Sequence, residues 1–467
     1  MLFNSQIFVV FFAVVFLLYW RLPHRAQNYF LLSASLVFYG SWNASLLLLL
    51  VFSASIDFLC ARLIARTTGA RARKCILVVS VVASLGILGF FKYGGFFVEN
   101  ALELARALGF EVPRATLDVI LPVGISFYTF QSMSYTIDVY RRELEPARNY
   151  LDFLLYISFF PQLVAGPIER GTRLLPQILR ERAALNLGAK LEGVKLLVIG
   201  YLQKVAIADS LAPTVERAFG QAGSLDSLSL LLGLYAFAGQ IYGDFAGYSN
   251  IARGTARLLG FELMRNFEEP YLAADITEFW RRWHISLSTW LRDYLYIPLG
   301  GNRRGRGRTY FNLMATMLLG GLWHGAAWNF VIWGGLHGVY LAVHRMLAGG
   351  ERKPRTGLRA VAGGLVTFHL VCFAWIFFRA DSTSDARVYL SGLARGTAAT
   401  SPQMLETVLY LGAILALDVL LRRRGKARML VLFSPHWVVE TCATAALVLA
   451  IFLIGDNHVV PFIYFQF

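Results

Sequence analysis

Long apolar runs recur along the chain from Gln6 to Ile454, and only short polar stretches separate them. A transmembrane helix needs about 20 predominantly apolar residues to cross a hydrocarbon layer roughly 30 Å thick. Runs near this length predict membrane spans, and they are residues 45–63, 117–137, 191–211, 228–245, 309–322, 326–346, 361–378, 404–421 and 437–454. With shorter runs included, the pattern predicts an all-α polytopic membrane protein with about 11 or 12 transmembrane helices plus re-entrant segments.

One stretch, residues 266–308, breaks this pattern because charged side chains are interleaved with aromatic ones. A charge at bilayer depth is costly unless it faces protein or water, and irregular backbone is tolerated there only under the same cover. The stretch therefore predicts a buried chamber, not a lipid-facing span. Its charged residues include Asp275, Glu278, Arg281, Arg282, Arg292 and Asp293, and a closing cluster of Arg303, Arg304, Arg306 and Arg308.

Composition supports the membrane interpretation, since 57% of the residues are hydrophobic and 16% are charged, against roughly 25% charged in soluble proteins. The formal net charge is +15, and Lys and Arg gather in the cytoplasmic loops of membrane proteins. We therefore expect the basic clusters at residues 62–74 and 422–428 to be cytoplasmic, and the aromatic tail, residues 456–467, to be periplasmic. This explanation of the charge argues against nucleic acid as a partner and favours contact with anionic membrane lipids.

Several common chemistries lack the residues that they need. The sequence has no HExxH zinc motif, no GxSxG elbow and no Walker phosphate loop, so we expect no metal or prosthetic group. The cysteines form no CxxC pair and stand far apart, at Cys60, Cys75, Cys372 and Cys442. Proton-coupled transport stays open, because acidic residues lie in or beside apolar runs at Asp57, Asp138, Asp244 and Asp418.

Two histidines lie in patterns that suit proton transfer. His284 lies in the charged central stretch, and His324 follows an apolar run within the sequence GGLWHG. An imidazole titrates near neutral pH and can take a proton from a hydroxyl, although it is costly to bury in an apolar span. His324 is therefore a candidate general base, and the alternative is a core histidine that donates to a backbone carbonyl. Helix packing is the expected role of His337, and His24, His344 and His436 are assigned to span ends.

Several motifs in this chain resemble those of the membrane-bound O-acyltransferase (MBOAT) family, in the bacterial branch that includes alginate O-acetylation proteins. They are LPVGISFY at residues 121–128, FPQLVAGPI at 160–168, DFAGYS at 244–249 and the block 278–302, which contains WRRWHISLS. The resemblance runs nearly end to end and includes the aromatic C-terminus PFIYFQF. It implies one membrane domain over residues 1–467, a helical bundle around a central funnel, with residues 266–345 as its catalytic core.

The resemblance also implies a function and a site. His324, in the Gly-Leu-Trp-His-Gly element, takes the catalytic role, and His284 is the second active-site residue. Acetyl-CoA is the implied cytosolic donor, and the acetyl group crosses the bacterial inner membrane to a periplasmic SGNH-type acetyltransferase or another acetylation subunit. The expected product is an O-acetylated exopolysaccharide, such as alginate or cellulose.

Two alternatives remain at the level of the sequence. One is a transporter of a polysaccharide or lipid intermediate, and the other is a non-catalytic scaffold of a secretion complex. The arginines at 281, 282 and 303–308 also have two interpretations, as ligands of donor phosphates or as a cytoplasmic topology signal.

Overall fold

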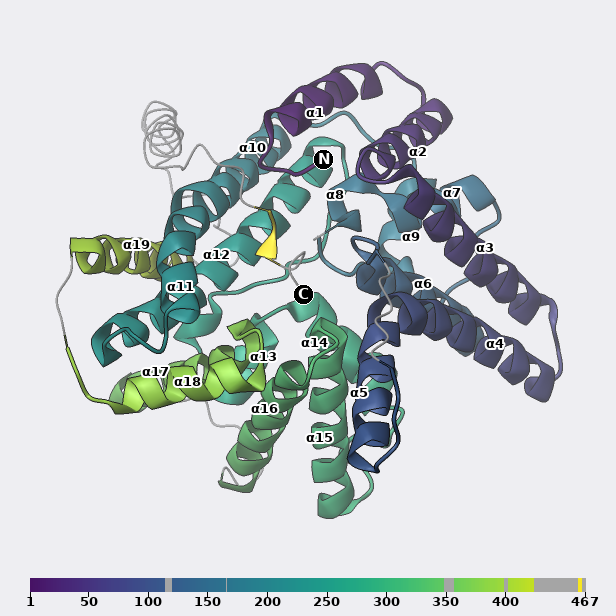
Figure 1. Ribbon diagram of the computed structural model, residues 1–467. Helices are drawn as coiled ribbons and strands as arrows, with labels where there is room; N and C mark the ends of the chain where they lie inside the picture. The colour runs from purple at the N-terminus through teal and green to yellow at the C-terminus, as the bar shows by residue number, and fades with distance from the viewer. Residues whose placement is uncertain (114–119, 165, 348–356, 399–401, 424–460, 464–467) are drawn as a thin grey trace. The chain divides into compact units, whose positions relative to one another are not determined.

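The computed structural model of the chain describes residues 1–113, 120–164, 166–347, 357–398, 402–423 and 461–463 (Figure 1). All regular secondary structure in this part of the chain is helical, which confirms the predicted all-α class. The helices form two compact units, one of residues Met1–Lys190 with Thr255–Met264 and one of residues Leu191–Gly254 with Arg265–Phe467. The single-domain organisation stays a prediction.

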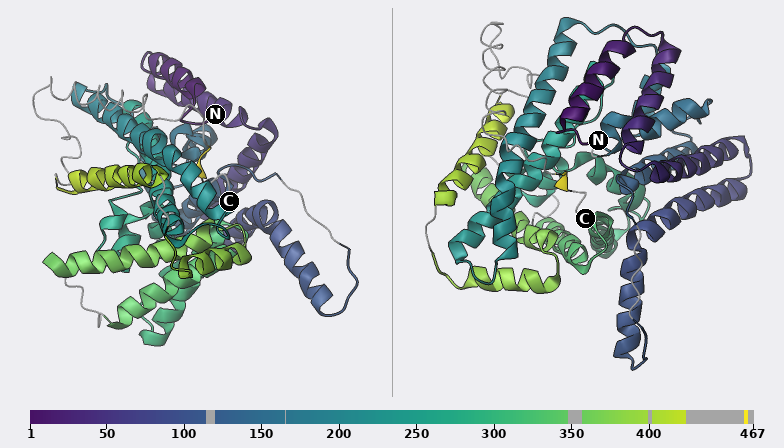
Figure 2. Two further views of the ribbon diagram at one scale, coloured as in Figure 1. Left: turned by 60° about the vertical axis from the view of Figure 1, so that its left-hand side comes forward. Right: turned by 45° about the horizontal axis from the view of Figure 1, so that its top comes forward.

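The first unit contains ten helical segments within its described residues. They are α1 (Gln6–Tyr19), α2 (His24–Gly40), α3 (Ala44–Arg66), α4 (Ala70–Leu88), the π-helical η1 (Gly89–Tyr93), α5 (Gly94–Ala107), α6 (Ile125–Arg141), α7 (Tyr150–Ser158), α8 (Phe160–Leu163) and α9 (Gly171–Leu179). Helices α3, α4 and α6 pack on one another, and α3 and α4 run side by side in Figures 1 and 2. The predicted helix over 117–137 begins only at Ile125, after Gly124 in a left-handed conformation.

A buried carboxylate joins these three helices. Asp57 of α3 accepts hydrogen bonds from Ser80 Oγ at 2.5 Å and Ser84 Oγ at 3.1 Å, both on α4. Ser132 of α6 donates to the same carboxylate, and all four side chains are buried. Because three hydroxyl donors surround it, Asp57 has the partners that a buried acidic group needs for a structural role.

The second unit contains the remaining helices. They are α10 (Leu187–Tyr201), π-helical η2 (Leu202–Asp209), α11 (Ser210–Gly220), α12 (Ser227–Leu258), η3 (Pro270–Leu272), α13 (Ile276–Arg282), α14 (Ile285–Leu291), π-helical η4 (Arg292–Tyr296), α15 (Gly305–His324), α16 (Trp328–Leu347), α17 (Gly357–Arg379), α18 (Thr383–Ala394) and α19 (Pro402–Arg423). Helices α10 and α12 extend by a few residues into the first unit. The short segments from 270 to 296 confirm that the central stretch contains no membrane-spanning helix.

Glycines allow α15 and α16 to pack closely, side by side (Figure 1). A Cβ added at Gly321 would lie 2.2 Å from the carbonyl oxygen of Phe330, and one at Gly334 would lie 2.3 Å from that of Met317. Neither position accepts a larger residue without a shift of backbone, so small residues set the helix spacing. This packing positions the end of α15, where His324 lies, against α16.

Three stretches of the described chain are both long and apolar enough to cross a membrane: Ala44–Arg66, Ala70–Ala107 and Gly357–Arg379. The first and third match predicted runs, whereas the second, formed by α4, η1 and α5, was not among them. Other long helices, such as α12, carry polar residues along their length. The total of about 11 or 12 spans and the orientation stay predictions, and the predicted span 437–454 lies outside the described residues.

Candidate active site

His324 is the last residue of α15 and is enclosed by aromatic rings. Its imidazole lies with ring centroids 5.0 Å from Trp323, 5.0 Å from Trp333 and 5.3 Å from Phe378, and all four side chains are buried. Trp333 comes from α16 and Phe378 from the end of α17, so three helices form the enclosure. An imidazole in such surroundings is held in one orientation and shielded from water.

His284 lies beside His324, as the sequence interpretation requires. The two ring centroids are 6.3 Å apart, and His284 is fully buried. Phe245 of α12 packs against the His284 ring at 4.6 Å, and Trp323 lies 5.9 Å from it. The structure therefore brings together the two histidines that are 40 residues apart in the sequence.

His337 lies one ring further from this pair. Trp333 separates it from His324, with centroids 4.8 Å from His337 and 5.0 Å from His324. Trp280 and Phe279 pack against His337 at 5.0 and 6.2 Å. Such a buried position among aromatic rings agrees with the packing role expected of this residue, which stays a prediction.

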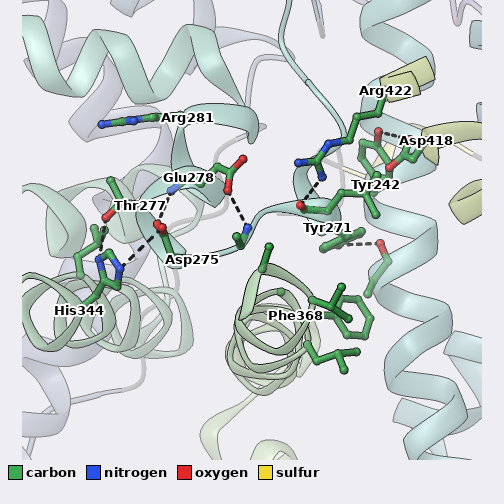
Figure 3. Close-up of a pocket in the computed structure, with 18 of the residues that line it drawn as sticks. Tyr242, Tyr271, Asp275, Thr277, Glu278, Arg281, His344, Phe368, Asp418 and Arg422 are labelled. Carbon is green, nitrogen blue, oxygen red and sulfur yellow. Dashed lines mark hydrogen bonds and ion pairs between the residues drawn. The ribbon is translucent and has the colours of Figure 1, made fainter. Parts of the chain in front are cut away.

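A large cavity of about 1540 Å³ lies in the same unit, lined by α13, the C-terminal part of α16 and the N-terminal part of α17 (Figure 3). Side chains of α12, α15, α19 and the segment 271–302 complete its lining. Tyr242, Tyr271 and Phe368 provide aromatic surface, and Tyr271 donates a hydrogen bond to the carbonyl oxygen of Ala238 at 2.8 Å. The lining is drawn in part from residues 266–308, and the prediction that this stretch forms a buried chamber stays a prediction.

Aromatic rings lie between the cavity wall and His324. Tyr271, in the wall, receives a hydrogen bond from Trp375 Nε1 at 3.2 Å. Trp375 stacks on Trp333 at 5.8 Å, and Trp333 contacts His324. His324 and His284 are not among the residues that line the cavity. Tyr271, Trp375 and Trp333 thus form a chain of contacts from the cavity wall to His324.

The acidic residues of the cavity are already engaged by donors. Asp275 caps α13 by accepting from the Glu278 N–H at 2.9 Å, and Glu278 accepts from Arg282 at 2.7 Å. Asp418 accepts from Tyr242 Oη at 2.8 Å. Figure 3 shows Asp418 on the opposite side of the cavity from Asp275. The basic side chains are therefore the more available charges for a ligand.

Four arginines line the cavity, and they differ in their partners. Arg292 pairs with Asp293 at 2.7 Å, and Arg422 donates to the carbonyl oxygen of Leu272 at 2.7 Å. Arg281 and Arg345 line it without an ion pair to any other described residue. Of the arginines proposed from the sequence as phosphate ligands, Arg281 alone lines the cavity; Arg282 pairs with Glu278, and residues 303–308 are exposed.

Sequence reasoning missed two residues of this cavity, His344 and Arg345. His344 was assigned to a span end, yet its ring contacts Thr277 Oγ1 at 3.2 Å and lies 3.8 Å from Asp275. The signal was present but weak, since His344 and Arg345 follow His337 by about two helical turns. Residues at that spacing share a helix face, which here extends from the aromatic rings to the cavity.

A buried ion group lies on the other side of α12. Lys204, in the π-helical segment η2, contacts Asp209 at 2.7 Å and Asp244 at 2.9 Å, and all three side chains are buried. The sequence interpretation named Asp244 as a possible proton relay but overlooked Lys204. With an ammonium group between them, the two carboxylates have the partner that burial demands.

Residues 461–463 dock on this group. The Ile463 N–H donates to Asp244 Oδ2 at 2.7 Å, and Phe462 is fully buried against Phe245 at 5.3 Å and Tyr248 at 4.5 Å. Residues 461–463 thus bind their own chain, residues 456–460 and 464–467 of the predicted tail lie outside the described residues, and its periplasmic location stays a prediction. Because Phe245 also contacts His284, the tail supports the site.

Replacing Phe462 by alanine is therefore expected to lower both activity and protein level. A buried Phe→Ala change costs about 3–5 kcal/mol in protein cores, and it removes the support behind Phe245. The measurement is polymer O-acetyl content per inserted protein, in a strain that lacks the native gene. Phe462→Leu keeps most of the volume and serves as the control. Normal acetylation and normal accumulation of Phe462→Ala would show that Phe462 does not support the site.

Comparison with known proteins identifies relatives of this chain. The model of the membrane-bound O-acyltransferase family, MBOAT, matches residues 141–382, which include both histidines. The probable alginate O-acetylases AlgI of Azotobacter vinelandii and Pseudomonas aeruginosa are each 42% identical to this chain, over 85% of it and over 79% and 76% of their own lengths. The peptidoglycan O-acetyltransferase of Helicobacter pylori is 37% identical, over 84% of this chain and 80% of its own.

These matches cover the helices that carry the two histidines and most of the cavity lining. A family model that spans more than half of the chain, together with relatives above 40% identity, agrees with the resemblance drawn from the motifs. The transporter and the scaffold are therefore set aside. The chain belongs to the membrane-bound O-acyltransferase family, in the branch of the alginate O-acetylases, and is an acyltransferase of the membrane.

Proposed function

We propose that this enzyme moves acetyl groups from cytosolic acetyl-CoA, through the site at His324, to an acceptor hydroxyl on the outer side of the inner membrane. The observation that carries the proposal is the buried pair of His324 and His284, whose ring centroids lie 6.3 Å apart. Relatives named as O-acetylase and O-acetyltransferase support acetyl as the transferred group.

In the proposed reaction, His324 takes the proton of the acceptor hydroxyl as the hydroxyl oxygen attacks the thioester carbonyl. The new C–O bond forms, the C–S bond breaks, and CoA leaves as a thiolate that receives the proton from His324. A positioned general base gives rate enhancements of about 10²–10⁴. His284 orients the reacting groups or donates an N–H to the developing oxyanion.

The cavity lined by Arg281 and Arg345 is the proposed donor site. Its volume of about 1540 Å³ exceeds the roughly 300–1,000 Å³ of pockets for drug-sized ligands, so a nucleotide with a pantetheine arm has room. Guanidinium groups bind phosphates through paired hydrogen bonds, and tyrosine and phenylalanine rings offer surface to an adenine. The pantetheine thioester would then extend toward Trp333 and His324.

The acceptor side of the proposal rests on the relatives. Their printed names specify alginate and peptidoglycan, which are both polymers outside the cytoplasm. We propose that a periplasmic SGNH-type acetyltransferase, or another acetylation subunit, receives the acetyl group for a polymer such as alginate or cellulose. Acetyl-CoA is a cytosolic metabolite, so transfer across the membrane explains the need for a membrane enzyme.

Membrane vesicles that contain the full chain are expected to transfer label from radiolabelled acetyl-CoA to the protein fraction or to added polymer. Arg281→Ala and Arg345→Ala should each raise the KM for acetyl-CoA about tenfold or more with kcat retained, since a hydrogen bond to a charged group contributes about 1.5–3 kcal/mol. Arg304→Ala, an exposed arginine that does not line the cavity, is the matched control. If no label is transferred, acetyl-CoA is not the donor. If KM for acetyl-CoA is unchanged in Arg281→Ala and Arg345→Ala, the cavity is not the donor site.

A further inference from the structure

The backbone at His284 has a conformation that is unusual for a residue with a Cβ. Its φ is 42° and its ψ is 55°, in the left-handed region, and it stands immediately before α14. Such a conformation costs of the order of 1–3 kcal/mol for a residue other than glycine and persists only where the surroundings hold it. The contacts around this turn therefore decide where the imidazole points.

Asn266 supplies most of those contacts. Its backbone oxygen accepts from the Ile285 N–H at 2.9 Å, and its side-chain Oδ1 accepts from Ser286 N at 3.3 Å and Ser286 Oγ at 2.9 Å. Its Nδ2 donates to Ser249 Oγ at 3.2 Å, which fixes the amide to α12. All of these side chains are buried, at 1% relative exposure for Asn266 and 0% for Ser286.

This arrangement uses both ends of the amide. Ile285 and Ser286 provide the first two N–H groups of α14, which have no partner within the helix. Without the Asn266 side chain, Ser286 N–H and Oγ–H would be buried without their acceptor, and only backbone hydrogen bonds would link the left-handed turn to residues 266–268. On the far side of the turn, Glu268 N–H donates to the Arg282 carbonyl oxygen at 3.0 Å, so the segment 266–268 holds the turn on both sides of His284.

We propose that Asn266 is a positioning residue, which sets the orientation of His284 toward His324 without touching the substrate. Its side chain fixes the turn before α14, while Phe245 packs on the imidazole. This inference rests on the proposed function, because it gives Asn266 a role only through His284. It assigns Asn266 to the acyl-transfer step and not to donor binding, since Asn266 does not line the large cavity.

The test measures acetyl transfer from radiolabelled acetyl-CoA by full-length variants in membrane vesicles, per mole of inserted protein. Asn266→Ala is expected to lower kcat about 10- to 100-fold with an unchanged KM for acetyl-CoA, because a misplacement of about 1 Å costs up to 10²-fold. Asn266→Asp, which keeps an oxygen for Ser286, should retain more kcat than Asn266→Ala. Ser249→Ala, which removes only the link to α12, should have a smaller effect.

Asn28→Ala is the matched control, because Asn28 is also buried with both amide atoms hydrogen-bonded but belongs to the first unit. An unchanged kcat in Asn266→Ala, a rise in KM alone, or an equal fall in Asn28→Ala overturns the positioning role. His284→Ala in the same assay separates the two proposals. If His284→Ala loses activity and Asn266→Ala does not, only the role of Asn266 fails; if His284→Ala stays active, the function proposed for His284 fails as well.

Discussion

Replacing His324 by alanine is expected to abolish polymer acetylation while the protein still accumulates in the membrane. A general base contributes about 10²–10⁴ to the rate, so activity per inserted protein should fall by at least 10²-fold. Alanine is accepted more readily than histidine in an apolar environment, and the rings of Trp333 and Phe378 surround the position. His324→Ala should therefore lose activity without losing stability.

The measurement is polymer O-acetyl content alongside protein level, in a strain that lacks the native gene. His324→Gln adds a second variant, since it keeps hydrogen-bonding groups but cannot take up the proton. His284→Ala should also be severe, whereas His337→Ala should act mainly through protein level, because His337 packs among Trp280, Trp333 and Phe279. A well-expressed His324→Ala variant with near-normal acetylation would move the proton acceptor elsewhere, with His284 as the next candidate.

Much of the fold could be predicted because bilayer thickness imposes a length on apolar runs. The run 45–63 became α3 and the run 361–378 became α17, since nothing in either conflicts with a helix. The helix predicted over 117–137 starts late because Gly124, with φ of 75°, ends the preceding loop. The π-helical turns at η2 and η4 had no signal, as they arise from packing and not from hydropathy.

In the candidate site, residues with a local sequence signal could be predicted, and residues whose role depends on contacts distant in the sequence could not. His324 was identified because a polar ring among apolar and glycine residues stands out in the sequence, and His284 because it lies in the charged central stretch and in a motif that resembles the family's. Asn266 was not, since an asparagine in a polar stretch carries no periodic signal, and its importance depends on the turn at His284. His344 was also missed as a cavity residue, because only the folded chain brings it close to Thr277 and Asp275.

Lys204 could have been noticed in the sequence, although the high mean hydropathy of the surrounding run makes a single lysine easy to overlook. It lies within the apolar run 191–211, and an ionisable residue in such a run has a specific partner as a rule. Its nearby partner, Asp209, was visible in the same run, but Asp244 comes from a different helix. The sequence therefore indicates the pairing of Lys204 with Asp209. It does not indicate that Asp244 joins them or that Ile463 binds Asp244.

Replacing Lys204 by methionine is expected to reduce the amount of folded, membrane-inserted protein severely. The change leaves Asp209 and Asp244 buried without the ammonium group that now lies 2.7 and 2.9 Å from them. Removal of one partner from a buried ion pair costs about 3–5 kcal/mol, which is a large part of the stability of a typical domain. The measurement is the detergent-resistant folded fraction together with the total level in membranes.

A variant in which all three ionisable groups are neutral is the control for the role of charge at Lys204. Replacing a whole buried ion group by neutral residues of similar volume is often neutral for stability, so Lys204→Met combined with Asp209→Asn and Asp244→Asn should regain much of the lost protein. The side-chain amide introduced by Asp244→Asn would still offer an oxygen to the Ile463 N–H, so the tail should remain docked in that variant. Lys190→Met, an exposed lysine on the preceding helix, should change stability by no more than about 0.5 kcal/mol. If Lys204→Met accumulates like the wild type, or if the triple variant is worse than the single one, the three groups are not held together by charge.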